Sequence, residues 1–458
     1  MITRRVVRLV DERYGKAPFL RRALRYVFPE HWSFLLGEIA LYAFVVLVAT
    51  GIYLTLFYTP STAHTTYHGS YAPLAGREMT EAYASTLRLS FDVKAGLLIR
   101  QTHHWAANVF IAAIVLHLMR VFFTGAFRKP RDITYYVGVT MLALALVEGF
   151  AGYSLVDDLL SGMGLAIAYG VVLSIPFVGA NLGLLIWGGE YPGAEDFLSR
   201  LYIAHVLIFP ILIATLIAVH ILLITLAHHG QFHERGKTAR NVVGATAWPT
   251  YAFRSIGLAL CVIAAVFLLG GLVQINPIWL WGPFDTWLST NGAQPDWYMG
   301  WLIGALRLMP SFEPTIGSYT LIPNPFFGGV LFPVLVFLFL YLYPALDRRF
   351  TGVRGYHHLL ERPRDAPVRT AIGIALLSVV AVVLFAGAAD RIFVQTGLSY
   401  QDQLWIFRAL LVSLPTVAFF LALTVCRELK AHELHPVLGE HGIPGHEPGD
   451  PRASLPEG

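Results

Sequence analysis

The sequence predicts an all-α, polytopic membrane protein with about eight transmembrane helices. Hydrophobic residues make up 56% of the chain and charged residues only 14%, whereas a soluble domain carries about 25% charged residues. The mean hydropathy is correspondingly high, at +0.59. Eight apolar segments reach or approach the ~18 residues that a helix needs to span a bilayer. They cover residues 34–58, 96–123, 134–156, 200–227, 253–275, 326–346, 368–388 and 404–426.

The positive charges orient these segments. Most of the 33 Lys and Arg residues lie in the two terminal segments and in alternate loops, which all fall on one side of the membrane. By the positive-inside rule this side is the cytoplasm. We therefore expect a multi-pass protein of the cell (plasma) membrane with cytoplasmic N- and C-termini. The net charge of +4 then reflects topology and contact with membrane lipid, and it indicates no nucleic-acid partner.

The chain divides by composition into four parts. Residues 1–30 are basic and amphipathic and lack the apolar core of a signal peptide, so we expect a cytoplasmic interfacial segment. Residues 31–230 hold the first four spans, which we expect to form a four-helix bundle, and residues 231–427 hold the last four. Residues 428–458 are rich in Pro, Gly, His and Glu, and we expect a disordered cytoplasmic tail.

Four histidines occupy matched positions on two of the spans. His103 and His117 are 14 residues apart on the second span, which is roughly 320° of helix rotation and ~21 Å of rise. His205 and His220 are 15 apart on the fourth span, which is roughly 60° and ~22 Å. Each helix thus presents two imidazoles on one face at two depths. Two such helices predict two bis-histidine sites for b-type haem, and bis-histidine ligation suits electron transfer.

Helix direction sorts the histidines into two sites. Both helices run from the outside inwards, so His103 and His205 form an outer pair, and His117 and His220 form an inner pair. His104 lies roughly 220° around the helix from His117, so we interpret it as a neighbour of the outer ligand. A proton relay or a helix–helix hydrogen bond is the alternative reading of a membrane histidine. Four histidines with matched spacing argue against it.

Glycines on the two flanking spans repeat the histidine interval. Gly37 and Gly51 are 14 residues apart, as are Gly138 and Gly152. A glycine lets a flat macrocycle approach the backbone closely. Ordinary packing of small residues between helices is the alternative, and the matched register on both spans favours a haem cradle.

Two arginines lie three residues from a predicted ligand. Arg100 precedes His103, and Arg120 follows His117. An arginine inside a membrane needs an anion, and haem carries two propionates. We therefore include both arginines among the haem-binding residues. The alternative is that their guanidinium groups reach the membrane interface.

These residues resemble the cytochrome b subunit of quinol:cytochrome c reductases, the cytochrome bc complexes. The resemblance runs from about Phe34 to the end of the last span. It includes the outer loop between the fifth and sixth spans, whose Pro295-Asp296-Trp297-Tyr298 is similar to the family's Pro-Glu-Trp-Tyr motif. The matching positions are Arg100, His103, His117, Arg120, Gly138, Gly152, Tyr153, Arg307 and Pro310.

Details of the match resemble the actinobacterial branch of the family. Asp296 replaces the usual Glu, and the stretch from Gly152 to Asp158 is of the actinobacterial kind. The 15-residue histidine spacing also resembles the split, plastid-type protein and Gram-positive forms. Two features argue against the split type: it carries a haem-binding Cys where this chain has Leu35, and it distributes seven helices over two chains, whereas this chain has eight predicted spans.

The resemblance implies a Q-cycle that contributes to the proton motive force. Quinol would be oxidised near the outer face, and electrons would cross through the outer and inner haems to an inner quinone site. The implied quinone is menaquinone. The implied outer quinol site lies against the segment Gly164 to Pro176 and comprises Gly164, Pro295, Asp296, Trp297 and Tyr298. Its catalytic candidates are Asp296, Tyr298 and Glu313.

Proton transfer at the outer site requires a base beside the quinol hydroxyl. Asp296 is the first candidate, and we expect its membrane-proximal setting to raise its pKa. Glu313, farther along the loop, is a second proton acceptor.

The implied inner quinone site is less complete. The family's Lys-Asp pair at the start of the fifth span becomes Arg254-Ser255 here, so the usual acid is absent. We assign Trp32, His228, His229 and Arg254 to this site, with the two histidines as substitute proton donors. The alternative for these histidines is an interfacial position near anionic lipid head groups.

The implied partners are a Rieske iron–sulfur subunit, a cytochrome c-type subunit and a second copy of the chain in a homodimer. The chain itself has neither a Cys-rich iron–sulfur motif nor a covalent haem motif. The sequence leaves open whether a terminal oxidase is attached. Two other functions are the alternatives to a subunit of a cytochrome bc complex. A dihaem quinone-linked anchor of a dehydrogenase usually has four or five helices, and a haem-free proton-coupled transporter would show no Soret absorption.

Overall fold

The computed structural model describes residue 5 and residues 11–12, 22–289 and 294–440. Within these residues, eight helices are long and apolar enough to cross a membrane. The predicted fold class is therefore confirmed. These eight spans are Trp32–Thr55, Gly96–Phe123, Asp132–Ser154, Phe197–Ala227, Ala247–Leu272, Phe327–Thr351, Pro367–Gly387 and Tyr400–His432.

Regular α-helix accounts for most of each span. The long helices are α3 (Leu35–Thr55), α5 (Gly96–Phe123), α6 (Asp132–Ser154), α10 (Phe209–Ala227), α11 (Ala252–Leu272), α14 (Phe332–Thr351), α15 (Pro367–Gly387) and α17 (Tyr400–Glu440). The shorter helices are α4 (Glu81–Phe91), α7 (Leu159–Leu173), α8 (Gly179–Trp187), α9 (Phe197–Ile203), α12 (Ile278–Trp281), α13 (Trp297–Leu308) and α16 (Ala389–Thr396).

Short strands join the loops at the ends of the helices. Antiparallel pairs are β1 (Val27–Pro29) with β5 (Gly244–Thr246), β2 (His64–Thr66) with β3 (Glu78–Thr80), and β6 (Thr315–Ile316) with β7 (Tyr319–Thr320). One parallel pair joins β4 (Gln231–Phe232) to β8 (Leu359–Leu360).

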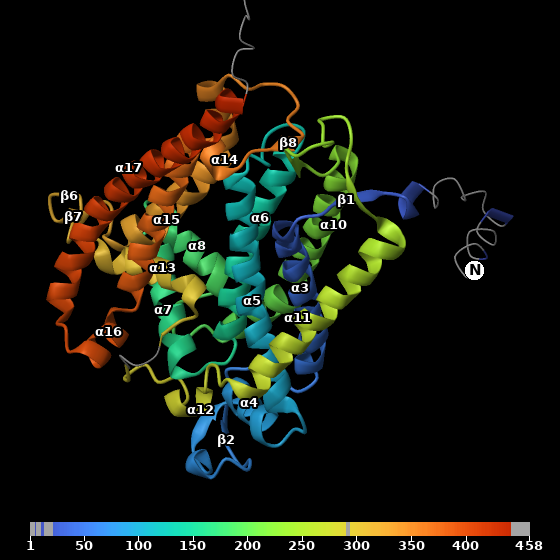
Figure 1. Ribbon diagram of the computed structural model, residues 1–458. Coiled ribbons are helices and arrows are strands. Elements are labelled where there is room, and N and C mark those ends of the chain that lie inside the picture. The colour runs from blue at the N-terminus through green and yellow to red at the C-terminus, as the bar shows by residue number, and fades with distance from the viewer. Residues whose placement is uncertain (1–4, 6–10, 13–21, 290–293, 441–458) are drawn as a thin grey trace, which may run out of the picture.

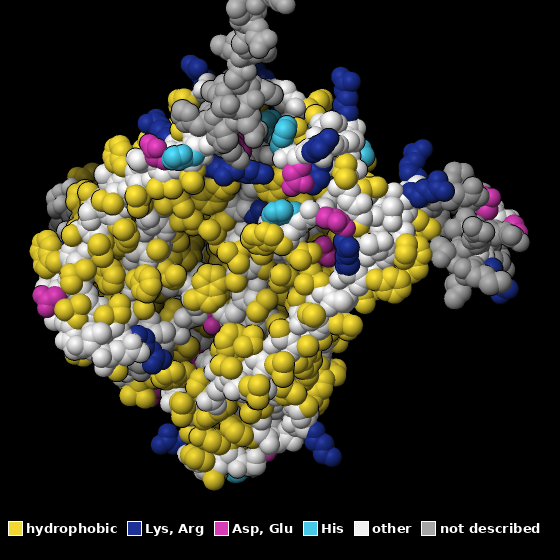
Figure 2. All heavy atoms as spheres, viewed as in Figure 1, with side chains coloured by type: hydrophobic (Ala, Val, Ile, Leu, Met, Phe, Trp, Pro, Cys, Tyr) yellow, Lys and Arg dark blue, Asp and Glu magenta, His cyan; other side chains and the backbone are white. Residues whose placement is uncertain are grey.

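Helices α5 and α6 lie in the middle of the molecule (Figure 1). Helices α3 and α11 pack on α5, and α10 packs on α6, whereas α13, α15 and α17 form a second group. Strand β1 and the end of α17 lie at one end of the bundle, and α4, β2 and α12 lie at the other (Figure 1). Hydrophobic side chains cover the middle of the face seen in Figure 2, and Lys and Arg side chains gather at its upper end. This distribution fits a protein that spans a bilayer.

Glycines allow close helix packing in the second group. Gly300 and Gly304 of α13 face α15, where a Cβ on Gly304 would collide with the carbonyl oxygen of Val383 and one on Gly387 would collide with Gly300. Small residues at this spacing let helix backbones approach in a membrane, where van der Waals contact drives association. Helix α13 is thereby fixed with the 295–298 loop at its start.

A buried ion network joins the two groups at the end where β8 lies. Arg128, after α5, contacts Asp347 of α14 at 2.7 Å and Glu361 at 2.8 Å. Arg369 of α15 contacts the same Glu361 at 2.6 Å. Buried charges are tolerated when they are paired in this way, and removal of one partner leaves a costly unpaired charge.

The end of the chain differs from the expected boundary. Helix α17 continues to Glu440, so residues 428–440 are helical, whereas the sequence predicted disorder from residue 428. Glu428, Leu429, Lys430 and Ala431 are good helix formers, and the Pro- and Gly-rich composition that suggested disorder is concentrated farther along. The rest of the predicted tail, and most of the predicted N-terminal interfacial segment, lie outside the described residues.

Candidate functional site

The four histidines of the predicted haem sites face one another in two pairs. The ring centres of His103 and His205 are 6.3 Å apart, and those of His117 and His220 are 6.4 Å apart. Two metal–nitrogen bonds of about 2 Å and two ring radii of about 1 Å require roughly 6 Å between such centres. Each pair therefore leaves the space that one six-coordinate metal needs. These are the outer and inner pairs that helix direction predicts.

A π-helical turn explains how the unequal histidine spacings meet. His205 lies in the turn Ala204–Ile208 between α9 and α10, within one continuous span. A π turn holds one residue more than an α turn. The 15 residues from His205 to His220 therefore advance like 14, by roughly 320° and not the roughly 60° expected for an ideal helix. Both helices consequently present their histidines in the same register.

The four glycines lie directly against the four histidines. A Cβ on Gly51 would lie 3.3 Å from Cε1 of His103, and one on Gly37 would lie 3.3 Å from Cε1 of His117. On α6, a Cβ on Gly152 would lie 2.7 Å from Cε1 of His205, and one on Gly138 would lie 3.6 Å from Cε1 of His220. A side chain at most of these positions would crowd an imidazole. This arrangement fits a cofactor cradle better than ordinary helix packing, in which the glycines would face another backbone.

The two pairs differ in what touches their remaining nitrogens. Thr50 Oγ1 lies 2.8 Å from Nδ1 of His103, and Glu148 Oε1 lies 3.0 Å from Nδ1 of His205. The Glu148 contact is electrostatic, because its angles are not those of a hydrogen bond. Nδ1 of His117 and of His220 is buried and has no hydrogen-bond partner among the described residues. Outer-shell partners of this kind orient metal-binding histidines.

Neither Arg100 nor Arg120, the two predicted propionate partners, forms an ion pair with a carboxylate in the described part of the chain. Arg100 is buried and donates to the carbonyl oxygen of Asn276 at 3.3 Å. The guanidinium of Arg120 lies 4.3 Å from the ring centre of Phe34. The Nε atoms of both arginines are buried without a hydrogen-bond partner. Membrane arginines without an anion fit a site for haem propionates.

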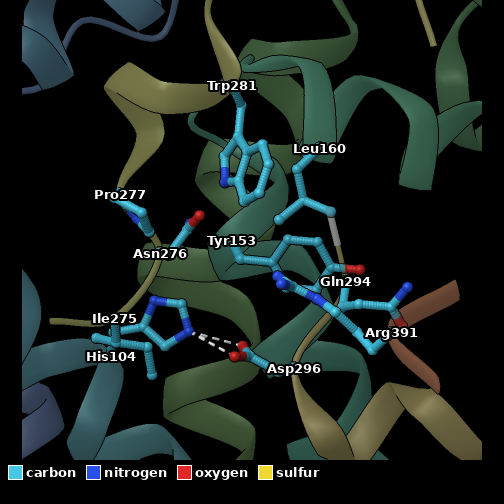
Figure 3. Close-up of a pocket in the computed structure, with 10 residues that line it drawn as sticks. All are labelled: His104, Tyr153, Leu160, Ile275, Asn276, Pro277, Trp281, Gln294, Asp296 and Arg391. Atoms are coloured by element: carbon cyan, nitrogen blue, oxygen red, sulfur yellow. Dashed lines mark hydrogen bonds and ion pairs between the residues drawn. The ribbon is translucent and has the colours of Figure 1, made fainter. Parts of the chain in front are cut away.

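A cavity of about 150 Å³ lies beside the outer pair (Figure 3). Helices α5, α6, α7, α12 and α16 contribute to its wall, together with two loops. His104 and Asp296 lie side by side at one end, and Trp281 lies at the other (Figure 3). The lining residues are His104, Tyr153, Leu160, Ile275, Asn276, Pro277, Trp281, Gln294, Asp296 and Arg391.

Asp296 forms a tight cluster with His104 and Tyr298. Nε2 of His104 lies 2.7 and 2.8 Å from the two carboxylate oxygens of Asp296, and the Tyr298 hydroxyl donates to Oδ2 at 2.8 Å. Asp296 precedes α13 without capping it through its side chain. His104 thus faces away from the ligands, as helix phase predicts, but helix phase does not predict that Asp296 is its partner. A polar side chain on the opposite face of an apolar helix was the signal that it had a partner of its own.

The expected direction of the Asp296 pKa is wrong. Burial raises the pKa of the Asp296 carboxyl, but the neighbouring charge of His104 and hydrogen bonds from His104, Tyr298 and Asn108 lower it more, so that it lies below its ordinary value. The prediction considered burial and omitted the partner. Asp296 is therefore ionised at neutral pH, and the same interactions that keep it ionised also make it a weaker base.

Other residues assigned to the outer site lie at or beyond its edge. Pro295 directly precedes Asp296, Trp297 is 42% exposed, and Gly164 packs behind the wall, with its Cβ position 3.4 Å from the Tyr153 hydroxyl. Glu313 is exposed and accepts a hydrogen bond from the backbone N–H of Asn324 at 3.0 Å. It does not line the cavity, because the chain leaves α13 into the β6–β7 hairpin.

A second, larger cavity of about 810 Å³ lies near the other end of α5. Trp32 lines it, as predicted for the inner quinone site, whereas His228, His229 and Arg254 do not. His229 contacts the Tyr26 hydroxyl, and Arg254 forms an exposed ion pair with Glu30. The lining residues are His31, Trp32, Ser33, Leu36, Leu116, Met119, Arg120, Phe123, Thr124, Phe232, Glu234, Arg362, Pro363, Arg364, Cys426 and Leu429.

A carboxylate that is not among the predicted site residues, Glu38, lies beside Gly37. Glu38 accepts hydrogen bonds from the hydroxyls of Tyr251 and Ser255 at 2.7 Å each, and from Tyr42 at 3.3 Å. Ser255 is the position at which the resembled family carries its acid, so α3 supplies an acid to the place that α11 leaves without one. An ionisable residue inside an apolar span was the available signal.

Comparison with known proteins agrees with this geometry. A family model described as cytochrome b(N-terminal)/b6/petB matches residues 108–283. The cytochrome bc1 complex cytochrome b subunit of Streptomyces coelicolor is 44% identical over 96% of this chain and 80% of its own length. That of Mycobacterium leprae is 46% identical over 95% of this chain and 78% of its own length.

A solved structure described as a hyperthermophilic respiratory Complex III has the same fold. Its TM-score is 0.68 at 21% identity, with 92% of this chain and 99% of that chain covered. The bundle, the facing histidines and the actinobacterial relatives lead to one conclusion: the chain belongs to the family of cytochrome b subunits of cytochrome bc1 complexes.

Proposed function

We propose that this chain carries electrons across the membrane through two b-type haems, as the cytochrome b subunit of a respiratory quinol:cytochrome c reductase. The observation that carries the proposal is the pair of facing histidine sites, each with ring centres just over 6 Å apart and each flanked by two glycines. Haem bound there supplies one-electron redox chemistry. The histidines of each helix hold the two sites ~21 Å apart along the helix axis, on one line through the bilayer.

Quinol oxidation is proposed at the outer cavity. Asp296 accepts the proton of a quinol hydroxyl, since its carboxylate is ionised and lies in the cavity wall. Tyr298 holds Oδ2 of that carboxylate, and His104 holds both of its oxygens, so the base is fixed before the substrate arrives. Glu313 has no part in this proposal, because it lies outside the cavity.

Quinone reduction is proposed at the large cavity lined by Trp32 and Arg120. His228, His229, Arg254 and Glu38 all lie outside the lining of this cavity. Glu38, which three hydroxyl groups hold beside Gly37, is the first candidate proton donor. His229 lies in the same cluster, because the ring of Phe28 contacts both His229 and Tyr251, the hydroxyl partner of Glu38.

The remaining roles follow from the family. We infer that the chain works in the plasma membrane with both termini cytoplasmic, as a homodimer with a Rieske iron–sulfur subunit and a cytochrome c-type subunit. The quinone is proposed to be menaquinone. The names of the relatives, all subunits of cytochrome bc1 complexes, support an assembly of this kind.

Haem stoichiometry in the purified complex tests the proposal. The reduced-minus-oxidised spectrum and a pyridine haemochrome assay should give two b-type haems per chain. A spectrum without b-type absorption would refute the proposal and would favour the alternative of a haem-free transporter. Two haems without quinol-dependent reduction would instead favour the membrane anchor of a dehydrogenase.

A further inference from the structure

On α6, a polar residue lies four positions before each of the two glycines that contact the histidines. Thr134 lies four residues before Gly138, and Glu148 lies four residues before Gly152. Residues four apart lie on the same face of a helix. Glu148 and Thr134 therefore occupy equivalent positions of the outer and inner sites. The sequence places an acid at one and a neutral hydroxyl at the other.

Glu148 has one titratable neighbour within ion-pair distance in the described part of the chain. Its Oε1 lies 3.0 Å from Nδ1 of His205, and both side chains are only 17% exposed. Its other oxygen, Oε2, is buried without a hydrogen-bond partner. No Lys or Arg among the described residues forms an ion pair with it. A membrane-buried carboxylate is costly, so its placement against a predicted haem ligand points to a function there.

A carboxylate in this position changes the properties of a metal-bound imidazole. The Glu148 carboxylate lies 3.0 Å from Nδ1 of His205 without forming a hydrogen bond, so it acts on this imidazole through its charge. A negative charge there favours the more positive, oxidised state of an iron bound by His205. The inner pair lacks such an acid: among the described residues, no carboxylate forms an ion pair with His117 or His220, and their Nδ1 atoms have no hydrogen-bond partner. An arginine lies one helix turn from a ligand in both sites, Arg100 from His103 and Arg120 from His117, so the arginines do not distinguish the sites.

We propose that Glu148 is a positioning residue that lowers the midpoint potential of the outer haem by acting through His205. The proposal rests on the proposed function, in that the outer pair must bind haem. It attributes the expected difference in midpoint potential between the two haem sites to the side chain of Glu148. An electron that enters the outer site would then move toward the inner site with a favourable change in free energy.

Redox titration of the two b haems in the purified complex tests this role. Glu148→Gln keeps the shape of the side chain without its charge, and Glu148→Thr copies the inner site. Both should make the outer haem easier to reduce by about tenfold in equilibrium constant, which is about +59 mV for a one-electron couple. The inner haem should keep its potential and serves as the internal reference. Glu148→Asp retains the charge and should lie closer to the wild type.

Thr50→Val is the matched control, since it removes a neutral partner from the other outer ligand, His103. It should shift the outer potential by less than about threefold. An unchanged outer potential in Glu148→Gln with two haems bound would overturn the inference and leave the proposed function intact. Loss of the outer haem from both Glu148→Gln and Glu148→Asp would assign Glu148 to haem retention and would also overturn it. Fewer than two haems in the wild type would refute the proposed function itself.

Discussion

The outer and inner ends of the bundle share one cradle and differ in what surrounds it. Both have a facing histidine pair and two glycines from α3 and α6. The outer end adds Thr50 and Glu148 against its two histidines, and the His104–Asp296 pair in the wall of a cavity of about 150 Å³. The inner end adds an aromatic- and arginine-lined cavity of about 810 Å³. The comparison teaches that the helices repeat the cofactor site, while a few polar side chains give each end its own chemistry.

The largest expected effect is the loss of the outer haem site. His205→Ala deletes one of the two histidines that would hold the outer haem, so the complex should retain one b haem per chain and its quinol oxidation should fall to background. Haem stoichiometry and quinol:cytochrome c activity measure this. His104→Ala is the control, because His104 faces Asp296 and should leave both haems bound. If His205→Ala kept two haems, the pairing of His103 with His205 would be wrong.

A change at Asp296 should separate chemistry from cofactor binding. Asp296→Asn keeps the shape but removes the proton acceptor, and a positioned base contributes roughly 10²–10⁴-fold to a rate. Quinol oxidation should slow by that order while both haems stay bound. Stopped-flow reduction of the outer haem by quinol is the measurement. Glu313 lies outside the cavity, so Glu313→Gln should leave the rate of quinol oxidation within about twofold of the wild type. Equal slowing by both variants would contradict the assignment of Asp296 as the proton acceptor.

Two matched glycine variants should affect the two ends unequally. An added Cβ at Gly152 would lie 2.7 Å from the outer ligand His205, whereas one at Gly138 would lie 3.6 Å from the inner ligand His220, which is ordinary contact. Gly152→Ala should therefore lower outer haem occupancy several-fold, and Gly138→Ala should leave inner occupancy near normal. Haem-resolved difference spectra would show this. Equal losses from both variants would contradict the asymmetry.

The last expected effect is at the inner acid and concerns a rate, with both haems still bound. Glu38→Gln should slow reoxidation of the inner haem by quinone by about tenfold, because a hydrogen-bonded carboxyl would no longer supply a proton. Flash-induced or rapid-mixing kinetics of that haem measure it. The exposed Glu30, paired with Arg254 at the same end, provides the control. A similar slowing in Glu30→Gln would assign the effect to surface charge.

Spacing along single helices predicted much of this architecture. It gave the eight spans, the histidines that face each other and the glycines that lie against them. Each of these depends on a period that one helix imposes on its own sequence. The His104–Asp296 contact and the Glu38 cluster join residues from different helices or loops, and no single-helix period reports on such contacts.

The residues that fall outside the two cavity linings, and the pKa direction of Asp296, share that origin. His228, His229 and Arg254 are expected at the inner site because they follow or precede its helices in sequence, and they do not line the larger cavity. Glu313 was assigned from its place in the loop, which the β6–β7 hairpin redirects. The pKa of Asp296 was judged from burial, and the partner that reversed its direction came from α5.

The π turn at Ala204–Ile208 also sets how this membrane helix can change during evolution. Because the turn holds one surplus residue, deletion of one residue there would restore a regular α-helix with a 14-residue interval. His205 and His220 would then stay on one face of the helix at nearly the same separation. Related chains can therefore differ in length by one residue at this point and still present both histidines toward α5.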